Sequence, residues 1–389
     1  MRAYLDYNST TPVDPVVLAA MLPYFREESG NASSIHSAGQ TARAAVDRAR
    51  ESVAALIGAK PAEIVFTSGG TEADNLAIFG LVATSTAARK HIISTAIEHH
   101  AVLNSCQALE KTGVAVTFLP VGRDGIVDPD DIRRALRPET ILISVMHTNN
   151  ELGTIQPIEE IGTIVAETDI CFHCDAVQAA GKLPLEVNRL GVDLLSLSAH
   201  KIYGPKGVGA LFVRSGTPLE PQIHGGHHER DRRPGTENVP GIVGLGKSAE
   251  LARQNLTADT ARITAYRDRL EDALLAISFV RTNGDRTRRV GNTTNLSFAG
   301  AAGEALVIAL DLQGVAVSTG AACSSGSVEP SHVLLAAGLS PDEARSSLRF
   351  SLGRPTTSEE IDQAIDVIPA VVERLRSISP HGSRRLAVR

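Results

Sequence analysis

Seven short apolar segments, each followed by glycine or polar residues, constrain the fold more than any other feature of the sequence. They lie at residues 64–66, 91–95, 114–119, 141–146, 170–175, 194–199 and 208–213. Because polar residues do not alternate regularly with apolar ones in these segments, both faces of each strand are expected to be covered. Helical patterns accompany them, as at residues 37–57. The sequence therefore predicts an α/β fold with a mostly parallel seven-stranded sheet.

The pattern changes after about residue 260. A predicted amphipathic helix with Leu270 and Leu274 begins a second series of elements, with further segments at 292–298, 303–313, 347–352 and 358–377. We expect residues 12–258 to form a large domain, and residues 1–11 with 259–389 to form a smaller α+β domain. Residues 379–389, with three arginines, are expected to form a mobile tail.

Composition excludes several classes of protein. The formal net charge of -6 argues against a protein that binds nucleic acid directly, which would need a basic face. No apolar run is long enough to cross a bilayer, and the first residues lack the apolar core of a signal peptide. Four cysteines in 389 residues do not form a disulfide framework. We therefore expect a cytoplasmic protein without membrane contact.

Three polar features follow predicted strands. Residues 67–72, with the sequence TSGGTE, form a glycine-rich turn before a helix, a geometry that suits a phosphate but also serves as an ordinary connection. Asp175 ends the segment 170–175. Its carboxylate could either contact a bound ligand or cap the N-terminus of a helix. Lys201 lies just past residues 194–199, although a single lysine is most often a solvated surface charge.

Together these features are more specific than any one of them. An enzyme that uses pyridoxal 5'-phosphate (PLP) needs a lysine for covalent attachment, a carboxylate beside the pyridinium nitrogen, and phosphate donors. Lys201, Asp175 and the turn with Gly70 and Thr71 supply all three, each at a strand end. The combination predicts a PLP enzyme.

The sequence also resembles the cysteine desulfurases of the NifS/IscS type, which belong to the class-V aminotransferases of PLP fold type I. The resemblance covers nearly the whole chain. It includes YLDYNSTTPVDP at 4–15, TSGGTEADN at 67–75, NNELG at 149–153, GTEN at 235–238, STGAACSSG at 318–326 and SLRFSLGR at 347–354. It implies a large PLP-binding domain with a seven-stranded sheet and a smaller domain that carries a catalytic cysteine.

Residue by residue, the resemblance implies how PLP is held. Lys201 would bind it covalently, Asp175 would pair with the pyridinium nitrogen and Gln178 with the ring hydroxyl. His99 would stack on the ring and is a candidate acid or base. The phosphate would contact four residues of one subunit, Gly70, Thr71, Ser198 and His200, and Thr236 of the neighbouring subunit, which implies a homodimer.

The resemblance also implies a substrate and a nucleophile. Arg349 would clamp the carboxylate of L-cysteine with two hydrogen bonds, and Asn8 would lie close by. Asn150 would lie near both this carboxylate and the ring hydroxyl of PLP. Cys323 stands among small residues in STGAACSSG, which suits an accessible, mobile thiol rather than a core cysteine. Its thiolate would take the substrate sulfur as a persulfide and leave alanine.

The sulfur acceptor is left open. The persulfide could serve iron–sulfur cluster assembly, tRNA thiolation or DNA phosphorothioation through an acceptor protein. Within the same fold, the alternatives are a selenocysteine lyase and an aminotransferase. An aminotransferase would not need Cys323. A non-catalytic scaffold would be expected to have lost Lys201 and Asp175, and both are present.

Two tempting motifs are given less weight. Cys171 and Cys174 have the spacing of a redox pair, but in a strand their side chains would point to opposite faces. The histidine-rich segment 224–230 could suggest a metal site. We assign it a role in the structure or in the wall of the active site, and expect no metal. Cys106 is expected in the core.

Overall fold

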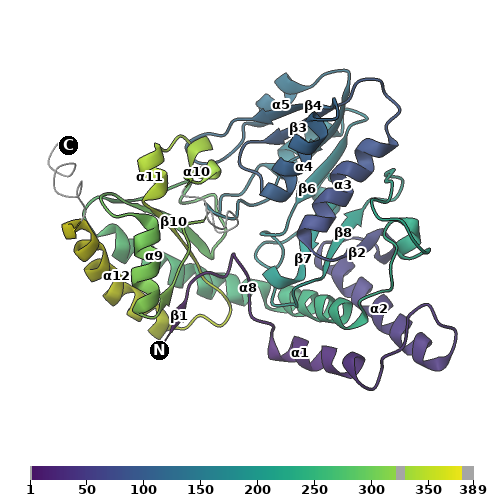
Figure 1. Ribbon diagram of the computed structural model, residues 1–389, viewed down its shortest axis with the longest axis horizontal. Coiled ribbons are helices and arrows are strands. Elements are labelled where there is room, and N and C mark those ends of the chain that lie inside the picture. Colours follow the sequence, from purple (N-terminus) through teal and green to yellow (C-terminus); the bar gives the residue numbers. More distant parts are fainter. Residues whose placement is uncertain (1, 321–328, 379–389) are drawn as a thin grey trace.

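The computed structural model describes residues 2–320 and 329–378 and has two parts (Figure 1). The larger part, on the right of the view, contains a wide sheet between helices. The smaller part, on the left, contains the N-terminal strand β1 (Ala3–Tyr4) and the C-terminal helix α12 (Ser358–Ile378). Two predicted features, the nucleophile Cys323 and the tail at 379–389, lie outside the described residues.

The wide sheet has seven strands in the order β2-β8-β7-β6-β5-β3-β4. Neighbouring strands from β7 to β4 are parallel, and β8 is antiparallel to both β2 and β7. The strands are β2 (Ile64–Thr67), β3 (His91–Thr95), β4 (Ala115–Leu119), β5 (Thr140–Ser144), β6 (Cys171–Asp175), β7 (Leu194–Ser198) and β8 (Gly209–Val213). The predicted mostly parallel seven-stranded sheet is confirmed.

Helices cover both faces of this sheet, which explains why its inner strands are buried along nearly their whole length, whereas the edge strand β4 is partly exposed. Buried residues of α2, α5, α6 and the first part of α8 pack on one face. Buried residues of α3 and α4 pack on the other. These helices are α2 (Ser37–Leu56), α3 (Gly70–Thr84), α4 (His100–Glu110), α5 (Pro129–Ala135), α6 (Ile158–Val165) and α8 (Val239–Leu275).

Shorter helices connect these elements. They are α1 (Pro15–Met21), α7 (Val187–Leu190), α10 (His332–Ala336) and α11 (Pro341–Arg345), with the 3-10 turns η1 (Leu22–Phe25), η2 (Pro61–Glu63), η3 (Ala199–Lys201) and η4 (Glu229–Asp231). The turn η3 follows β7 directly and places Lys201 at the end of the wide sheet.

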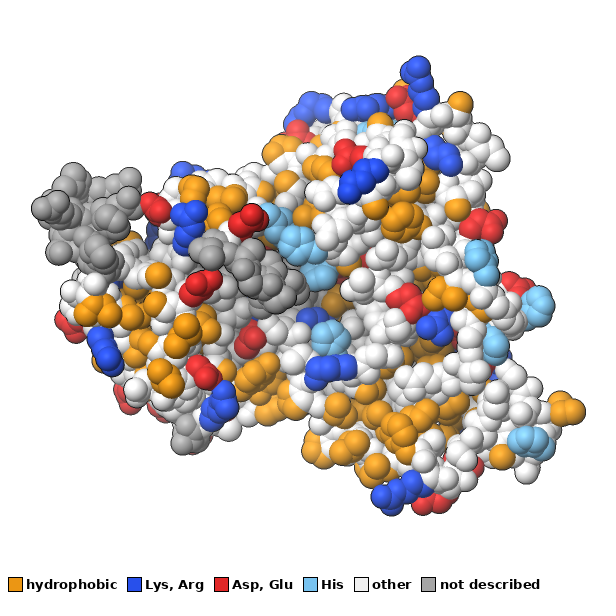
Figure 2. Space-filling model, in the orientation of Figure 1, with side chains coloured by type: hydrophobic (Ala, Val, Ile, Leu, Met, Phe, Trp, Pro, Cys, Tyr) orange, Lys and Arg blue, Asp and Glu red, His pale blue; other side chains and the backbone are white. Residues whose placement is uncertain are grey.

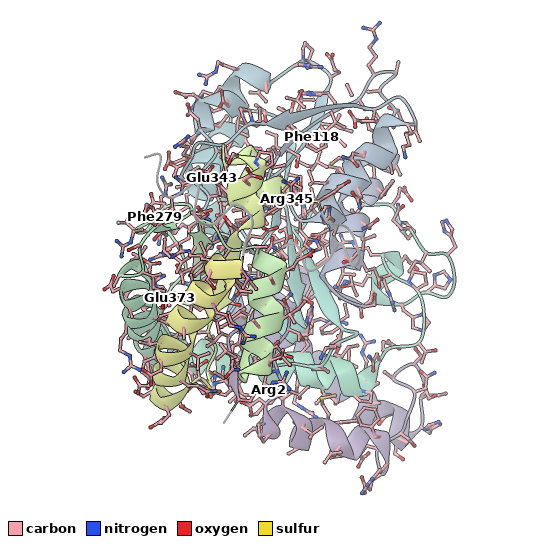
Figure 3. The ribbon with its side chains drawn as sticks, turned by 60° about the vertical axis from the view of Figure 1, so that its left-hand side comes forward. Arg2, Phe118, Phe279, Glu343, Arg345 and Glu373 are labelled. Carbon is pink, nitrogen blue, oxygen red and sulfur yellow. The ribbon has the colours of Figure 1, made fainter. Side chains whose placement is uncertain are left out.

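The smaller part has its own sheet and its own core. Its antiparallel strands are β9 (Val280–Thr282), β10 (Thr293–Phe298) and β12 (Ser347–Ser351), while β1 pairs with β11 (Val315–Ala316). Helices α9 (Gly303–Leu312) and α12 lie side by side in Figure 3. Arg2, labelled there, donates to Asp311 of α9 at 2.6 Å and ties the start of the chain to this part.

The 37-residue helix α8 joins the two parts. Leu245 and Ala249 belong to the core of the larger part, whereas Leu270 and Leu274 belong to the core of the smaller one. Leu5, near the N-terminus, lies in the same small core. The change of pattern near residue 260 therefore falls inside a single helix whose two ends pack against different cores.

Three cysteines lie among the described residues, and none lines the cavity described below. Cys106 is fully buried in α4, as predicted. Cys171 and Cys174 lie on β6, and burial raises the pKa of Cys171 to about 11 and of Cys106 to about 12. Such thiols are poorly ionised at neutral pH, which agrees with the low weight given to a redox role.

Membrane-spanning helices and metal-binding clusters are both absent from the part of the chain that the structure describes. No helix there is both long and apolar enough to span a membrane. No group of three or more histidine, cysteine or acidic side chains there could hold a metal ion.

Candidate active site

A cavity of about 360 Å³ opens where the parallel strands end. Because the carboxyl ends of parallel strands meet at one edge of the sheet, the loops that follow them converge there. The lining residues are Asn8, Ser9, Gly70, Thr71, Asp74, His99, Met146, Asn150, Asp175, Val177, Gln178, Ser198, His200, Lys201, Gly320 and Arg349. In Figure 2, histidine side chains gather at the hollow between the two parts of the molecule.

Eleven of the thirteen site residues predicted from the sequence line this one cavity. The two that do not are Thr236 and Cys323. Thr236 is exposed and lies outside the cavity of its own chain, and Cys323 is outside the described residues. Gly320, three residues before Cys323, borders the cavity. Motifs from both parts of the molecule therefore come together in one site.

Lys201 lies at the centre of the site. Its Nζ donates to the backbone carbonyl of Asn8 at 2.6 Å and to that of Ser9 at 2.7 Å. The amine is thus held between η3 and the N-terminal segment, inside the cavity rather than at the surface. This placement contradicts the view of Lys201 as a solvated surface charge.

The first turn of α3 presents backbone N–H groups at the cavity. Gly70 begins this helix, and a Cβ atom at Gly70 would come within 2.8 Å of Val177 Cγ2, so only glycine fits without a shift. The buried Ser198 Oγ accepts and donates no hydrogen bond within the described residues. His200 Nδ1 lies 3.1 Å from Thr10 Oγ1. A helix N-terminus beside an unpaired hydroxyl is an arrangement that binds an anion.

Three buried acids lie at or behind the floor of the cavity. Asp175 accepts the backbone N–H of Val177 at 2.9 Å, and burial raises its pKa to about 6, so it is ionised at pH 7. Burial raises the pKa of Asp74 well above its ordinary value, and Asp175 adds to this effect. Burial raises the pKa of Glu98 to about 8. At neutral pH Asp175 is therefore ionised, whereas Glu98 is mostly protonated.

His99 occupies the N-cap position of α4. Its Nδ1 accepts the N–H of Ala101 at 3.1 Å, and burial and the charge of Lys201 lower its pKa to about 4. The ring is therefore neutral at pH 7, with its proton on Nε2. A neutral ring can lie against an aromatic ligand without the cost of burying a charge.

Arg349 brings a guanidinium from β12 into the same cavity. Its Nη2 donates to Asp6 Oδ1 at 2.7 Å and to Ser9 Oγ at 2.8 Å. Its Nη1 donates to the carbonyl of Asn150 at 3.0 Å. Its buried Nε has no hydrogen-bond partner among the described residues. The side chain is thus fixed in place and still has donor capacity for an anionic ligand.

Asn8 joins the two parts beside the cavity. Its Nδ2 donates to Thr293 Oγ1 and the carbonyl of Asn150, and its Oδ1 accepts from Lys182 and Asn292. All four hydrogen-bonding positions of the amide are occupied. This geometry favours a positioning role for Asn8 over a direct contact with substrate.

The segment that carries Thr236 is anchored by a buried ion pair. Arg50 of α2 makes two 2.7 Å bonds to Glu229, which also accepts the N–H of Phe66 at 2.9 Å. Glu229 has a positive φ of 45° and keeps it at the cost of backbone strain. The ion pair ties this loop to α2 and β2, while Thr236 is exposed.

Sequence reasoning missed three features of the site. Asp74 lies within the quoted motif TSGGTEADN, one helical turn after Gly70, and that spacing could have placed it on the cavity side of α3. Asp6 and Lys182 gave no such signal, because their roles come from contacts with Arg349 and Asn8 on distant segments.

The sequence profile of the class-V aminotransferases matches residues 3–364. The chain is 52% identical over 381 residues to a protein named cysteine desulfurase IscS from Dictyoglomus turgidum, covering 98% of this chain and 97% of that protein. A solved structure of a NifS-like protein superposes with a TM-score of 0.91 at 37% identity, covering 96% of this chain and 100% of that one.

A second solved structure, of SspA in complex with cysteine, is 40% identical and superposes with a TM-score of 0.80. It covers 90% of this chain and 99% of that one. These matches extend over both parts of the fold and over the cavity residues from Asn8 to Arg349. The chain therefore belongs to the class-V aminotransferase family, among its cysteine desulfurases.

Proposed function

We propose that the chain binds PLP in the cavity and converts L-cysteine to L-alanine, with transfer of the sulfur to Cys323. The observation that carries the proposal is the meeting of Lys201, Asp175 and the first turn of α3 in one cavity. PLP carries a phosphate, an aromatic ring with a basic nitrogen, and an aldehyde. The cavity offers a group suited to each of these.

The residues present fit the cofactor. The N-terminus of α3 and the unpaired Ser198 hydroxyl suit the phosphate, with Thr71 and His200 beside them. Ionised Asp175 suits a protonated pyridine nitrogen, and neutral His99 suits the ring face. Bound PLP would supply an electron sink that weakens bonds at the substrate Cα and Cβ.

The chain's own groups would bind and orient the substrate and move protons. Arg349, held by Asp6 and Ser9, would take the substrate carboxylate, with Asn150 alongside. Lys201 would attach the cofactor and, once released, accept the Cα proton at Nζ. The carbonyls of Asn8 and Ser9 would keep that amine within the site.

Sulfur transfer is assigned to Cys323. Its thiolate would form an S–S bond to the substrate sulfur as the Cβ–S bond breaks, and a proton delivered to Cβ would complete alanine. L-Cysteine and a thiol thus become alanine and a persulfide, with no external oxidant. Gly320 borders the cavity. Three residues of chain span at most about 11 Å, so Cys323 would stay within that distance of the cavity edge.

A homodimer is part of the proposal. Thr236 is exposed, as a residue that serves a partner's site would be. Apolar side chains are also exposed on and just after α1, at Val16, Leu18, Leu22 and Phe25, and Figure 2 shows this apolar surface in its lower part. Sedimentation of a dimer would support this element, and a monomer at micromolar concentration would contradict it.

The remaining elements of the proposal are less specific. We propose a large domain at residues 12–258, a smaller domain formed by residues 1–11 and 259–389, and a cytoplasmic location. A sulfur-acceptor protein would take the persulfide onward for iron–sulfur cluster assembly, tRNA thiolation or DNA phosphorothioation. The name IscS of the relatives favours the first of these.

The test measures alanine and sulfide released from L-cysteine by the PLP-loaded protein in the presence of a thiol reductant. Wild type is expected to release both in equal amounts. Cys323→Ala should lower both by about 100-fold or more, because the nucleophile is lost. Cys171→Ser is the matched control, because that cysteine lies on β6 outside the cavity and should leave turnover near wild type.

Other outcomes would contradict the proposal. Alanine formed at the same rate by Cys323→Ala would exclude the persulfide step. Exchange of amino groups with a 2-oxo acid, without sulfide, would instead indicate an aminotransferase. Absence of PLP binding by wild type would exclude the whole assignment.

A further inference from the structure

Lys182 lies just outside the proposed cofactor cavity and was not among the expected site residues. It stands four residues after Gln178, in the turns that follow β6. Its Nζ donates to Gln178 Oε1 at 2.6 Å and to Asn8 Oδ1 at 3.0 Å. The lysine thus contacts the side-chain amides of two cavity residues that come from distant segments.

These contacts fix which way round the Gln178 amide lies. The amine of Lys182 donates, so the atom of Gln178 that faces it must be the oxygen. The backbone carbonyl of Asn8 only accepts, and it receives Gln178 Nε2 at 3.0 Å. Both neighbours therefore require the same orientation, and the amide nitrogen is the end that remains beside the cavity.

The same lysine fixes the Asn8 amide. Asn8 Oδ1 accepts from Lys182 and from Asn292 Nδ2, while Asn8 Nδ2 donates to Thr293 Oγ1 at 2.9 Å. Without the amine, Asn8 Oδ1 would keep only the contact with Asn292. Lys182 therefore helps to hold the N-terminal segment against the strand β10 as well as orienting Gln178.

An ion pair does not explain this lysine. Among the described residues, no carboxylate lies within 4.0 Å of Lys182 Nζ. Burial of the amine lowers its pKa well below the ordinary value, and the charges of Lys201 and Arg349 add to the effect. Two uncharged acceptors, Gln178 Oε1 and Asn8 Oδ1, lie within hydrogen-bond distance of this amine. The site is thus matched to a donor rather than to a charge.

We propose that Lys182 is a positioning residue that holds the Gln178 amide with its N–H toward the cofactor cavity. The inference rests on the proposed function, in which Gln178 meets the ring hydroxyl of PLP. In that orientation, the second N–H of Gln178 can donate to the ring oxygen. A flipped amide would set two acceptor oxygens against each other.

The test compares Lys182→Met, which keeps the length and loses the donor, with wild type in titrations of the apo protein with PLP. Lys182→Met should weaken PLP binding about tenfold, as expected when a buried hydrogen bond is lost and an acceptor is left unpaired. The visible absorbance band of bound PLP should also change its pH dependence. Lys111→Met, at an exposed position on the end of α4, is the matched control and should change neither property.

A double-mutant cycle separates this role from a general one. If Lys182 acts through Gln178, Lys182→Met should change PLP affinity by less than about twofold in a Gln178→Ala background. Lys182→Gln, which keeps an N–H donor, should bind PLP better than Lys182→Met. If Lys182→Met does not fold, the PLP affinity of Lys182→Gln can be compared with that of wild type instead.

Two results would overturn the inference alone. One is an unchanged affinity and spectrum in Lys182→Met, and the other is an equal loss with and without Gln178, which would indicate an effect of charge or folding. Both assume that wild type binds PLP. If wild type does not bind it, the proposed function fails together with this inference.

Discussion

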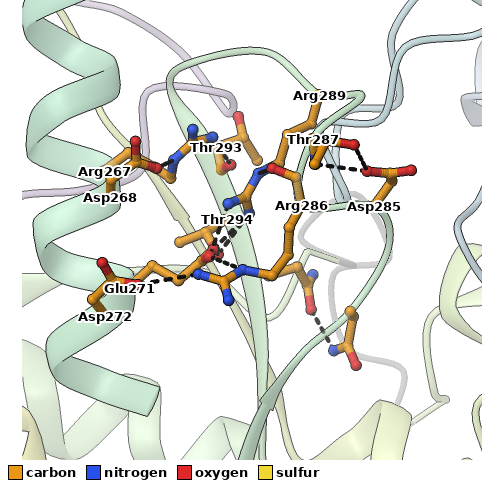
Figure 4. Close-up of polar contacts among 12 residues, drawn as sticks. Arg267, Asp268, Glu271, Asp272, Asp285, Arg286, Thr287, Arg289, Thr293 and Thr294 are labelled. Atoms are coloured by element: carbon orange, nitrogen blue, oxygen red, sulfur yellow. Dashed lines mark hydrogen bonds and ion pairs between the residues drawn. The ribbon is translucent and has the colours of Figure 1, made fainter. Parts of the chain in front are cut away.

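Two clusters of buried acids in this molecule have opposite properties. In the smaller part, Glu271 is fully buried, yet each of its carboxylate oxygens accepts hydrogen bonds from Arg289, Arg286 or Thr294 (Figure 4). Burial opposes its ionisation, but these bonds outweigh burial and lower its pKa to about 2. Beside the cavity, Asp74 and Glu98 are equally buried, and each has an oxygen with no hydrogen-bond partner among the described residues.

The difference separates a cluster that holds the fold from one that is ready for a ligand. A buried acid costs little when its oxygens are all paired, and it is then ionised and rigid. An acid with an unpaired oxygen stays protonated and costs stability until something binds beside it. Among the described residues, Asp74, Ser198 and Arg349 each bring a buried atom without a hydrogen-bond partner to the cavity, and other such atoms, as at Thr282, lie away from it.

The largest expected effect comes from breaking the paired cluster. Glu271→Ala should lower the free energy of unfolding by about 3–5 kcal/mol, because it leaves Arg289 as a buried cation without its carboxylate partner. Urea unfolding of the apo protein measures this change. Glu159→Ala, at an exposed pair with Arg189, is the control and should cost less than about 1 kcal/mol. Similar losses in the two variants would contradict the comparison.

The second prediction concerns the cavity cluster and pH. The pKa of Glu98, about 8 in the folded protein, lies above its ordinary value of 4.5. Its contribution to stability is therefore complete below about pH 4.5 and is lost as the pH rises through 8. Glu98→Gln mimics the protonated acid at every pH. The apo variant should retain on the order of 2 kcal/mol that wild type loses between pH 6 and pH 9.

Thermal or urea unfolding at several pH values would check this prediction. Glu271→Gln is the opposite control, since the pKa of Glu271 is lowered and its stabilising effect is present at neutral and alkaline pH. A parallel fall in stability of wild type and Glu98→Gln would show that Glu98 is ionised in the folded protein at neutral pH.

The smallest effect is expected at Asp6. Like Glu271, this acid is paired with an arginine, Arg349, but the pair lies beside the cavity. Asp6→Ala should raise the KM for L-cysteine about two- to fivefold, with kcat little changed, because Arg349 loses one of its anchors. Steady-state kinetics measures this, and Asp6→Asn, which keeps an acceptor oxygen, should stay near wild type. A lower KM in Asp6→Ala would mean that Asp6 competes with the substrate.

The strands of the larger part could be predicted because their signal is local. Residues 91–95 were predicted and observed as a strand, and residues 114–119 were observed as Ala115–Leu119. All five residues of the strand at 91–95 are buried because helices cover both of its faces, whereas the edge strand at 115–119 is partly exposed. The long helix α8 was harder to predict, because its apolar face turns from one core to the other and its pattern breaks near residue 260.

The candidate site was predictable to a similar extent. Gly70, Asp175 and Lys201 follow strands, and the end of a parallel strand is a position that a sequence pattern can locate. Lys182 and Asp6 could not be assigned in this way. A lysine four residues after a glutamine, or an aspartate near the N-terminus, has many meanings until its partner is known.

The sequence by itself determined the fold class, the family and the segments that meet at the cavity, since apolar runs and motifs are properties of neighbouring residues. Only the tertiary structure decided which polar atoms are paired. Asn8 and Thr293 are 285 positions apart and 2.9 Å from each other, and Glu271 and Glu98 are the same residue type with opposite shifts of pKa. Hydrogen bonds and burial depend on distances between remote segments, and these exist only after the chain has folded.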